Sequence, residues 1–149
     1  MNLLSRRSLF AIAAVVDVAL HARPVPVTAK ALAARHNLPP RHLETVLQAL
    51  VRNGILKGLR GPRGGYELAR ERRRVTVGDI VRAAQGGPEM RDEEGAPEPR
   101  SPLVEEVVAP AVAAAGEVFL RELDGITVED LCRRVDKTGG SDHPVDFTI

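Results

Sequence analysis

The chain is poor in the residues on which several classes of protein depend. Its 149 residues include one cysteine, one tyrosine, three phenylalanines and no tryptophan. A single cysteine excludes an intrachain disulfide framework and favours a reducing, cytoplasmic location. With so few aromatics the core must consist of Leu, Val, Ile and Ala, and the length suits one domain with an extension. No apolar run reaches the length of a membrane span, so no membrane partner is expected.

Enzymatic signatures are missing as well. The sequence contains no phosphate-binding loop, no nucleophile elbow and no paired histidine motif. Its histidines are scattered over different segments, and each is expected at the surface or as a helix cap rather than as a metal ligand. They are His21, His36, His42 and His143. We therefore expect neither an enzyme nor a metal site.

Charge is distributed unevenly along the chain, although the formal net charge is only +1. Residues 1–75 contain 14 Lys and Arg against 4 Asp and Glu, whereas residues 76–149 contain 7 against 16. Phosphate neutralisation and counterion release dominate affinity for nucleic acids, so the first half suits a polyanionic partner. The expected partner is double-stranded DNA.

A basic, glycine-rich segment separates two short apolar runs at residues 55–59 and 66–68 that predict strands. The segment reads Arg60-Gly-Pro-Arg-Gly-Gly-Tyr66. Its three glycines allow positive φ and close backbone approach, and its proline stiffens the turn, which leaves Arg60 and Arg63 at the tip. This pattern is typical of the wing of a DNA-binding domain. Taken alone, the segment fits an ordinary basic hairpin loop better than a wing, and the context decides between them.

Upstream of this hairpin, two helices are predicted at helix-turn-helix spacing. Residues 27–36 form the first, with Thr28 as N-cap, and residues 37–40 break it. The second begins near Pro40, ends at Asn53-Gly54, and turns Leu43, Val46, Leu47 and Leu50 to the core. Its other face carries side chains that can reach base edges or phosphates: Arg41, His42, Glu44, Thr45, Gln48 and Arg52. A merely solvated face is the alternative, with Glu44 paired to Arg41.

With these features combined, the chain resembles the Rrf-two family of bacterial winged-helix transcription regulators from about Leu4 to Gln85. The resemblance is carried by Ser5-Arg-Arg-Ser-Leu-Phe-Ala11, Asp17-Val-Ala-Leu20, Leu43-Glu44, Gly54-Ile-Leu56 and Arg60-Gly-Pro-Arg-Gly-Gly-Tyr66-Glu-Leu-Ala69. It continues more weakly at residues 75–81, 119–120 and 126–131. The family implies a homodimer that places recognition helices in successive major grooves and wing arginines in the minor groove.

Residues 86–102 form an acidic segment rich in Pro and Gly, which predicts a flexible loop. In cluster-binding members of the family the matching region carries three closely spaced cysteines that bind iron and sulfide. Residues 90–101 contain neither Cys nor His. We therefore expect no iron–sulfur cluster and no other cofactor. Asp92, Glu93 and Glu94 could hold a hard cation, but solvated carboxylates are the expected state.

Residues 103–137 are expected to form a long dimerisation helix and a short terminal helix. Apolar residues follow one stripe: Val104, Val107, Val108, Ala111, Ala115, Val118 and Phe119. The alternative is a helix packed on its own domain. Pro110 predicts either a kink or a straight helix that starts near Ala109. The terminal helix, capped at residues 127–130, carries Cys132, for which burial or a lowered pKa and redox sensing are alternatives. Residues 138–149 are expected to be disordered.

The N-terminus imitates a twin-arginine export signal over residues 1–22, because Arg6-Arg7 precede an apolar run. Asp17 interrupts this run after eight residues. The apolar residues also recur at helical spacing, which favours a core helix. An exported protein remains the alternative from a different class. In the DNA-binding interpretation, Arg6 and Arg7 contact phosphates.

The fold class predicted is mainly α with a small β-hairpin: a winged helix-turn-helix domain at residues 1–85 plus a long C-terminal dimerisation helix. The function predicted is a cytoplasmic homodimeric repressor that binds an imperfect palindrome. The expected DNA contacts are Arg6, Arg7, Thr28, Arg41, His42, Glu44, Thr45, Gln48, Arg52, Arg60, Arg63, Gly64, Gly65 and Tyr66. Control by a small-molecule effector or by Cys132 is left open, as is a winged helix that docks RNA or protein.

Overall fold

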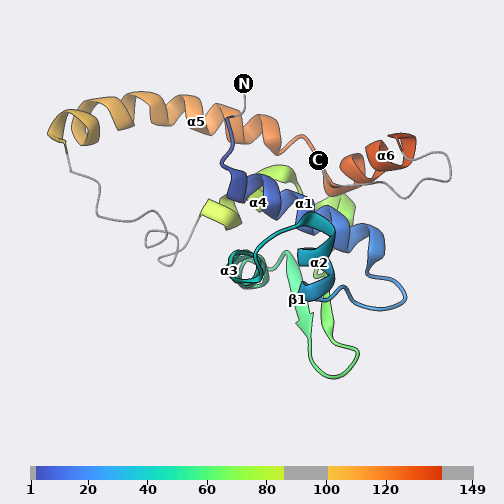
Figure 1. The fold of residues 1–149 in the computed structure, drawn as a ribbon. Coiled ribbons are helices and arrows are strands. Elements are labelled where there is room, and N and C mark those ends of the chain that lie inside the picture. The colour runs from blue at the N-terminus through green and yellow to red at the C-terminus, as the bar shows by residue number, and fades with distance from the viewer. Residues whose placement is uncertain (1–2, 86–100, 139–149) are drawn as a thin grey trace.

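The computed structural model describes residues 3–85 and 101–138. Helices make up most of it, with one antiparallel two-stranded hairpin, so the predicted fold class is confirmed (Figure 1). In chain order the elements are α1 (Arg6–His21), α2 (Ala29–His36), α3 (Pro40–Arg52), β1 (Leu56–Leu59), β2 (Gly65–Leu68), the 3-10 helix η1 (Arg72–Arg74), α4 (Val77–Gln85), the π-helical stretch η3 (Val104–Val108), α5 (Ala109–Leu123) and α6 (Val128–Thr138). The predictions for residues 86–100 and 139–149 lie outside the described residues.

Helix α1 contributes one wall of the hydrophobic core. Ser5 caps it, since its side-chain oxygen accepts a hydrogen bond from the Ser8 N–H at 3.1 Å. Ala11, Val15 and Val18 recur at helical spacing and are fully buried. Removing residues 1–22 as an export signal would therefore remove this wall of the core. None of the helices described is both long and apolar enough to cross a membrane.

Helices α2, α3 and α4 complete the core around α1. The four core positions predicted on α3 are all buried, as its helical periodicity requires. Leu32 of α2 and Ile80 of α4 are fully buried in the same cluster. Aliphatic side chains thus provide the core that the scarcity of aromatics demands.

Helices α4 and α6 begin side by side and are capped in the same way. Thr76 and Asp79 exchange backbone-to-side-chain hydrogen bonds at 3.0 and 3.1 Å, and Thr127 and Asp130 do so at 3.0 and 2.9 Å. Two backbone hydrogen bonds join the beginnings of these helices: the Val77 N–H donates to the Ile126 carbonyl at 2.8 Å, and the Val128 N–H donates to the Val75 carbonyl at 2.9 Å. The terminal helix is thereby fixed to the winged domain, and its predicted cap is confirmed.

Pro110 lies in the first turn of α5, which begins at Ala109 as the second of the two predicted alternatives has it, but the π-helical stretch before it was not predicted. The helical segment begins at Pro102, runs through η3 in π form, and continues as α5 with Pro110 in the first turn. Because Pro110 has no N–H and its ring crowds the carbonyl four residues earlier, ordinary α-helical bonding fails there. The Ala109 N–H instead donates to the Val104 carbonyl, five residues back. The wider π-helical turn therefore accommodates the proline without breaking the helix.

The long helix leaves its apolar stripe uncovered. Six large apolar side chains on η3, α5 and the preceding turn are 45–65% exposed: Leu103, Val104, Val107, Val108, Val112 and Val118. Nothing in the described part of the chain covers these six side chains. Only the C-terminal end of α5 packs on the domain, where it contacts α4 and Phe119 is half-buried. In Figure 1, α5 runs along one edge of the molecule while the hairpin projects from the opposite edge.

Candidate DNA-binding surface

The turn between α2 and α3 has the local geometry of a helix-turn-helix. The Thr28 hydroxyl oxygen accepts a hydrogen bond from the Ala31 N–H at 3.1 Å, so Thr28 caps α2 as predicted. Asn37 ends the helix in the left-handed region, with φ of 51°, a conformation that Asn tolerates better than most residues. Pro40 occupies the first turn of α3, where its missing N–H costs nothing.

Helix α3 presents the predicted polar face to solvent. Arg41, His42, Glu44, Gln48 and Arg52 are exposed, and Thr45 is half-buried with its hydroxyl donating to the Arg41 carbonyl at 3.3 Å. No ion pair joins Glu44 to Arg41 among the residues described, so the alternative of a paired Glu44 is not observed. The face combines guanidinium, amide, hydroxyl and carboxylate groups, which together can recognise every base in the major groove.

The hairpin is the wing that the sequence predicts. Leu56 pairs with Leu68 and Leu59 with Gly65, which leaves residues 60–64 as its tip. Gly61 has φ of 107°, a conformation that side chains disfavour. Arg60 and Arg63 are exposed at the tip, where guanidinium groups can enter a narrow minor groove.

Gly65 and Tyr66 attach the wing to the helix-turn-helix. The Tyr66 N–H donates to the Val27 carbonyl at 2.7 Å, and the Val27 N–H donates to the Tyr66 carbonyl at 3.0 Å. A Cβ at Gly65 would lie 2.6 Å from that Val27 carbonyl oxygen, and a Cβ at Gly64 would collide with the Leu59 carbonyl. Tyr66 itself is half-buried against the core. These three residues shape the wing, and their contact with DNA stays a prediction.

The N-terminus of α1 lies beside the start of α3. Arg6, Arg7 and His42 line one hollow of about 320 Å³ together with apolar residues of the turn. Arg6 is exposed, whereas Arg7 is half-buried. The structure thus brings the expected phosphate-contacting arginines to the same end of the recognition helix.

Asp17 is the residue whose role the sequence did not reveal. Its carboxylate is buried in α1 with only 1% of the side chain exposed. Arg35 donates two hydrogen bonds to it at 2.6 and 2.9 Å, while His36 Nε2 and His21 Nδ1 lie 2.8 and 3.2 Å from it. His36 is therefore largely buried and paired, which corrects the expectation of a surface or capping residue. An acidic residue inside an apolar helix was the available signal.

Burial alone would raise the pKa of Asp17, because a charged carboxylate loses its water. The hydrogen bonds from Arg35 and His36 and the nearby positive charges outweigh this effect, so the pKa of Asp17 lies below its ordinary value. The carboxylate is thus charged at neutral pH and joins α1 to the C-terminal turn of α2. It positions the first helix of the helix-turn-helix.

Cys132 is buried on α6. Burial raises the pKa of its thiol, and the hydrogen bond and charge from Arg72 counteract this only in part. The reactive, low-pKa thiol considered from the sequence is therefore not supported. In the ranges that the structure describes, no group of three or more His, Cys, Asp and Glu side chains is arranged to hold a metal ion.

Comparison with known proteins agrees with this geometry. The Rrf2 family model, described as "Iron-dependent Transcriptional regulator", matches residues 4–134. A putative HTH-type transcriptional regulator, slr0846, from Synechocystis is 33% identical over 133 residues, which is 86% of each chain. The protein rrf2 of Nitratidesulfovibrio vulgaris is 30% identical over 132 residues, 87% of each chain.

Solved structures of regulators share the fold. IscR of T. potens matches with a TM-score of 0.70 and 27% identity over 94% of this chain and 93% of that one. CymR, the global cysteine regulator of B. subtilis, matches with a TM-score of 0.63 and 28% identity over 90% and 98% of the two chains. With its helix-turn-helix and wing, the chain belongs to the Rrf2 family of DNA-binding, winged-helix transcription regulators.

Proposed function

We propose that this regulator is a homodimeric repressor that binds an imperfect palindrome in double-stranded DNA without an iron–sulfur cluster. The observation that carries the proposal is the combination of an exposed polar face on α3 with two exposed arginines on the wing. A dimer that covers promoter DNA excludes polymerase, which is the basis for assigning repression.

The two parts of this surface have different tasks. Arg41 and Gln48 on α3 read base edges in the major groove, because guanidinium and amide groups make paired hydrogen bonds with guanine and adenine. Arg60 and Arg63 follow the negative potential of a narrow A·T-rich minor groove. Arg6 contacts phosphate and gives affinity without sequence preference.

The uncovered stripe on η3 and α5 supports the dimer. A continuous apolar face on a long helix costs free energy in water and is covered in most soluble proteins by a partner. A second copy presents the same stripe, so a twofold axis makes the two faces self-complementary. The same axis relates two recognition helices and accounts for a palindromic operator.

Iron is implied by the family description, but the donor set of this chain does not fit a cluster. A cluster needs several thiolate or imidazole ligands that converge on one site. The chain has one cysteine, which is buried on α6, and residues 90–101 supply neither Cys nor His. We therefore propose that operator binding is independent of iron.

The location proposed is the cytoplasm, where the operator is. The rival is an exported protein whose first helix is only a signal. N-terminal sequencing of the mature chain separates the two, because an intact α1 supports the regulator and cleavage near Ala22 contradicts it. The other alternative is a winged helix that binds RNA or protein instead of DNA. The DNA-binding experiment described next distinguishes it from the regulator, because only the regulator should prefer the operator over a random duplex.

The test compares an operator, found by genome-wide mapping of bound DNA, with a random duplex in fluorescence anisotropy. Gln48→Ala should reduce the ratio of operator to random affinity by about 5- to 150-fold, since one base contact is worth roughly 1–3 kcal/mol. Gln85→Ala removes an exposed amide from α4 and serves as the matched control. Equal losses on both duplexes for Gln48→Ala, or wild-type binding without preference, would contradict the proposal.

A further inference from the structure

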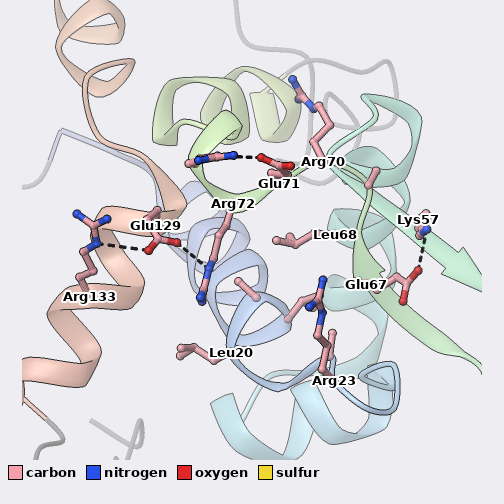
Figure 2. A pocket seen from close by; sticks show the side chains of 15 residues that line it. Leu20, Arg23, Lys57, Glu67, Leu68, Arg70, Glu71, Arg72, Glu129 and Arg133 are labelled. Atoms are coloured by element: carbon pink, nitrogen blue, oxygen red, sulfur yellow. Dashed lines mark hydrogen bonds and ion pairs between the residues drawn. The ribbon is translucent and has the colours of Figure 1, made fainter.

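A cleft of about 920 Å³ lies at the base of the wing, where α1 ends, the hairpin begins and α6 packs against η1. Figure 2 shows Leu20 and Leu68 in its interior, with charged side chains around them. Arg133 and Glu129 come from α6 on one side, and Lys57 and Glu67 come from the hairpin on the other (Figure 2). We call it the basic cleft.

Positive charge prevails in the basic cleft. Six cationic side chains line it against three carboxylates: Arg23, Lys57, Arg70, Arg72, Arg73 and Arg133 against Glu67, Glu71 and Glu129. Such an excess of like charges around one hollow is unfavourable unless counterions or a ligand compensate it. Any ligand that fits the cleft should therefore be negatively charged.

The carboxylates are already occupied. Lys57 binds Glu67 at 2.8 Å and Arg73 binds Glu71 at 2.8 Å. Glu129 is shared, since Arg72 and Arg133 approach its two oxygens at 2.7 and 3.3 Å. One carboxylate thus serves two guanidinium groups and neutralises only one of them.

Two further guanidinium groups add uncompensated charge. Arg70 donates to the Gly54 carbonyl at 3.2 Å and has no acidic partner within residues 3–85 and 101–138. Arg23 is exposed and forms no ion pair with any residue in the described segments. Arg23 and Arg70 come from the winged domain, whereas Arg133 comes from α6, so cationic groups line more than one wall.

We propose that the basic cleft binds a small molecule with two or more negative charges, held between guanidinium groups of the winged domain and of α6. Guanidinium groups bind carboxylate and phosphate oxygens through paired, charge-assisted hydrogen bonds. Leu20 and Leu68 provide an apolar surface for the body of such a ligand. A hollow of about 920 Å³ with cationic groups on more than one wall suits a small ligand, whose charged groups can meet several guanidinium groups at once.

Occupancy of the cleft gives a physical route to control, and this step rests on the proposed function. A ligand that bridges Arg23 and Arg133 links the segment between α1 and α2 to α6, which follows the proposed dimerisation helix. That segment is joined to the wing by the backbone hydrogen bonds between Val27 and Tyr66. The ligand would also compete with Glu129 for Arg72. The bound ligand would then fix the orientation of the wing relative to the dimerisation helices, so it would change operator affinity without touching DNA.

The experiment measures binding of inorganic pyrophosphate and of citrate to the full chain by isothermal titration calorimetry, without DNA and at constant ionic strength. Saturable binding of either probe, with one site per chain, is the expected result. Pyrophosphate as the tighter probe identifies a phosphorylated ligand, and citrate identifies a polycarboxylate; both outcomes support the site. The absence of saturable binding for both probes overturns it.

Two double variants locate the site. Arg23→Gln with Arg133→Gln removes one charge from the winged domain and one from α6, and should weaken the tighter probe by about tenfold or more. Arg121→Gln with Lys137→Gln removes the same charge outside the cleft, and should change affinity less than about twofold. If both double variants weakened binding of the probe equally, the loss would come from the overall charge of the protein and not from the cleft, and the proposed site would be wrong.

A parallel titration with random duplex DNA separates the cleft from the DNA-binding surface. The cleft variant should keep its affinity for random DNA within about twofold of the control variant. A loss on DNA as large as the loss on the probe would assign the cleft to DNA and overturn the small-ligand proposal. Because probe binding is measured without DNA, its failure is distinguishable from a failure of operator recognition.

Discussion

Asp17→Asn tests how the helix-turn-helix is held in place. The substitution keeps the shape of the side chain but removes the negative charge, so Arg35 and His36 lose the carboxylate that they share. Removing one partner of a buried ion pair costs roughly 3–5 kcal/mol. Because the Arg35 side chain is 36% exposed and can turn to water, we expect the low end, about 3 kcal/mol.

The free energy of unfolding is obtained from urea denaturation followed by circular dichroism near pH 7. Asp124→Asn is the matched control, because Asp124 also accepts two hydrogen bonds from one arginine, Arg82, but is 36% exposed. An exposed pair contributes much less than a buried one, because water screens its charges and solvates them when the pair is broken. The two variants therefore differ mainly in the burial of the carboxylate.

The dependence on pH has a defined sign. The pKa of Asp17 is lower in the folded chain than in the unfolded one, so its contribution is present above the unfolded pKa and is lost as pH falls through the folded pKa. The gap in unfolding free energy between wild type and Asp17→Asn should be constant around neutral pH and should narrow in acid. An Asp17→Asn variant as stable as wild type, or a gap that does not change in acid, would refute the reasoning.

Three further changes test other parts of the account. Gly65→Ala places a Cβ 2.6 Å from the Val27 carbonyl oxygen, so it should lower the free energy of unfolding, measured in urea, by more than Gly61→Ala at the open tip does. Equal losses for the two variants would contradict the close approach of the backbones at Gly65. Val112→Asp on the exposed apolar face should convert the dimer to a monomer in sedimentation velocity without changing the helical content. Glu117→Asp, a conservative change on the same helix, should remain dimeric, and a dimeric Val112→Asp variant would show that α5 does not form the dimer interface. Arg6→Ala should weaken operator and random DNA alike and reduce the slope of log affinity against log salt by about 1, and a selective loss on the operator would place Arg6 on a base instead.

Local chemistry made much of the fold predictable. The spacing of Leu43, Val46, Leu47 and Leu50 indicated the buried face of α3, and the same spacing indicated its exposed face. Thr28 and the Thr127–Asp130 pair fixed helix starts, since each satisfies backbone donors within one turn. The glycines at residues 61, 64 and 65 marked the wing. These signals act over a few residues and can be read without the fold.

Features that depend on distant residues could not be predicted. Asp17 binds side chains 18 and 19 residues away, so the sequence showed only an interruption in an apolar run. The π-helical stretch before Pro110 depends on how the backbone redistributes its hydrogen bonds, so the sequence predicted a helix start near Ala109 but not the π form of the turn before it. The basic cleft combines cations from segments that meet only after folding. Hydrophobic periodicity and helix capping carry no information about contacts between residues that are far apart in the sequence.

Hydroxyl-radical footprinting on the DNA upstream of the chain's own coding sequence tests the central claim most directly. Two recognition helices related by a twofold axis should protect two patches on one face of the duplex, about one helical turn or roughly 34 Å apart. Protection should be the same for protein that has been treated with an iron chelator and then freed of it as for untreated protein. Gln48→Ala should need about 5- to 150-fold more protein for the same protection, while Gln85→Ala should need no more than wild type. A single patch, continuous protection without preference, or protection that requires iron would contradict the account.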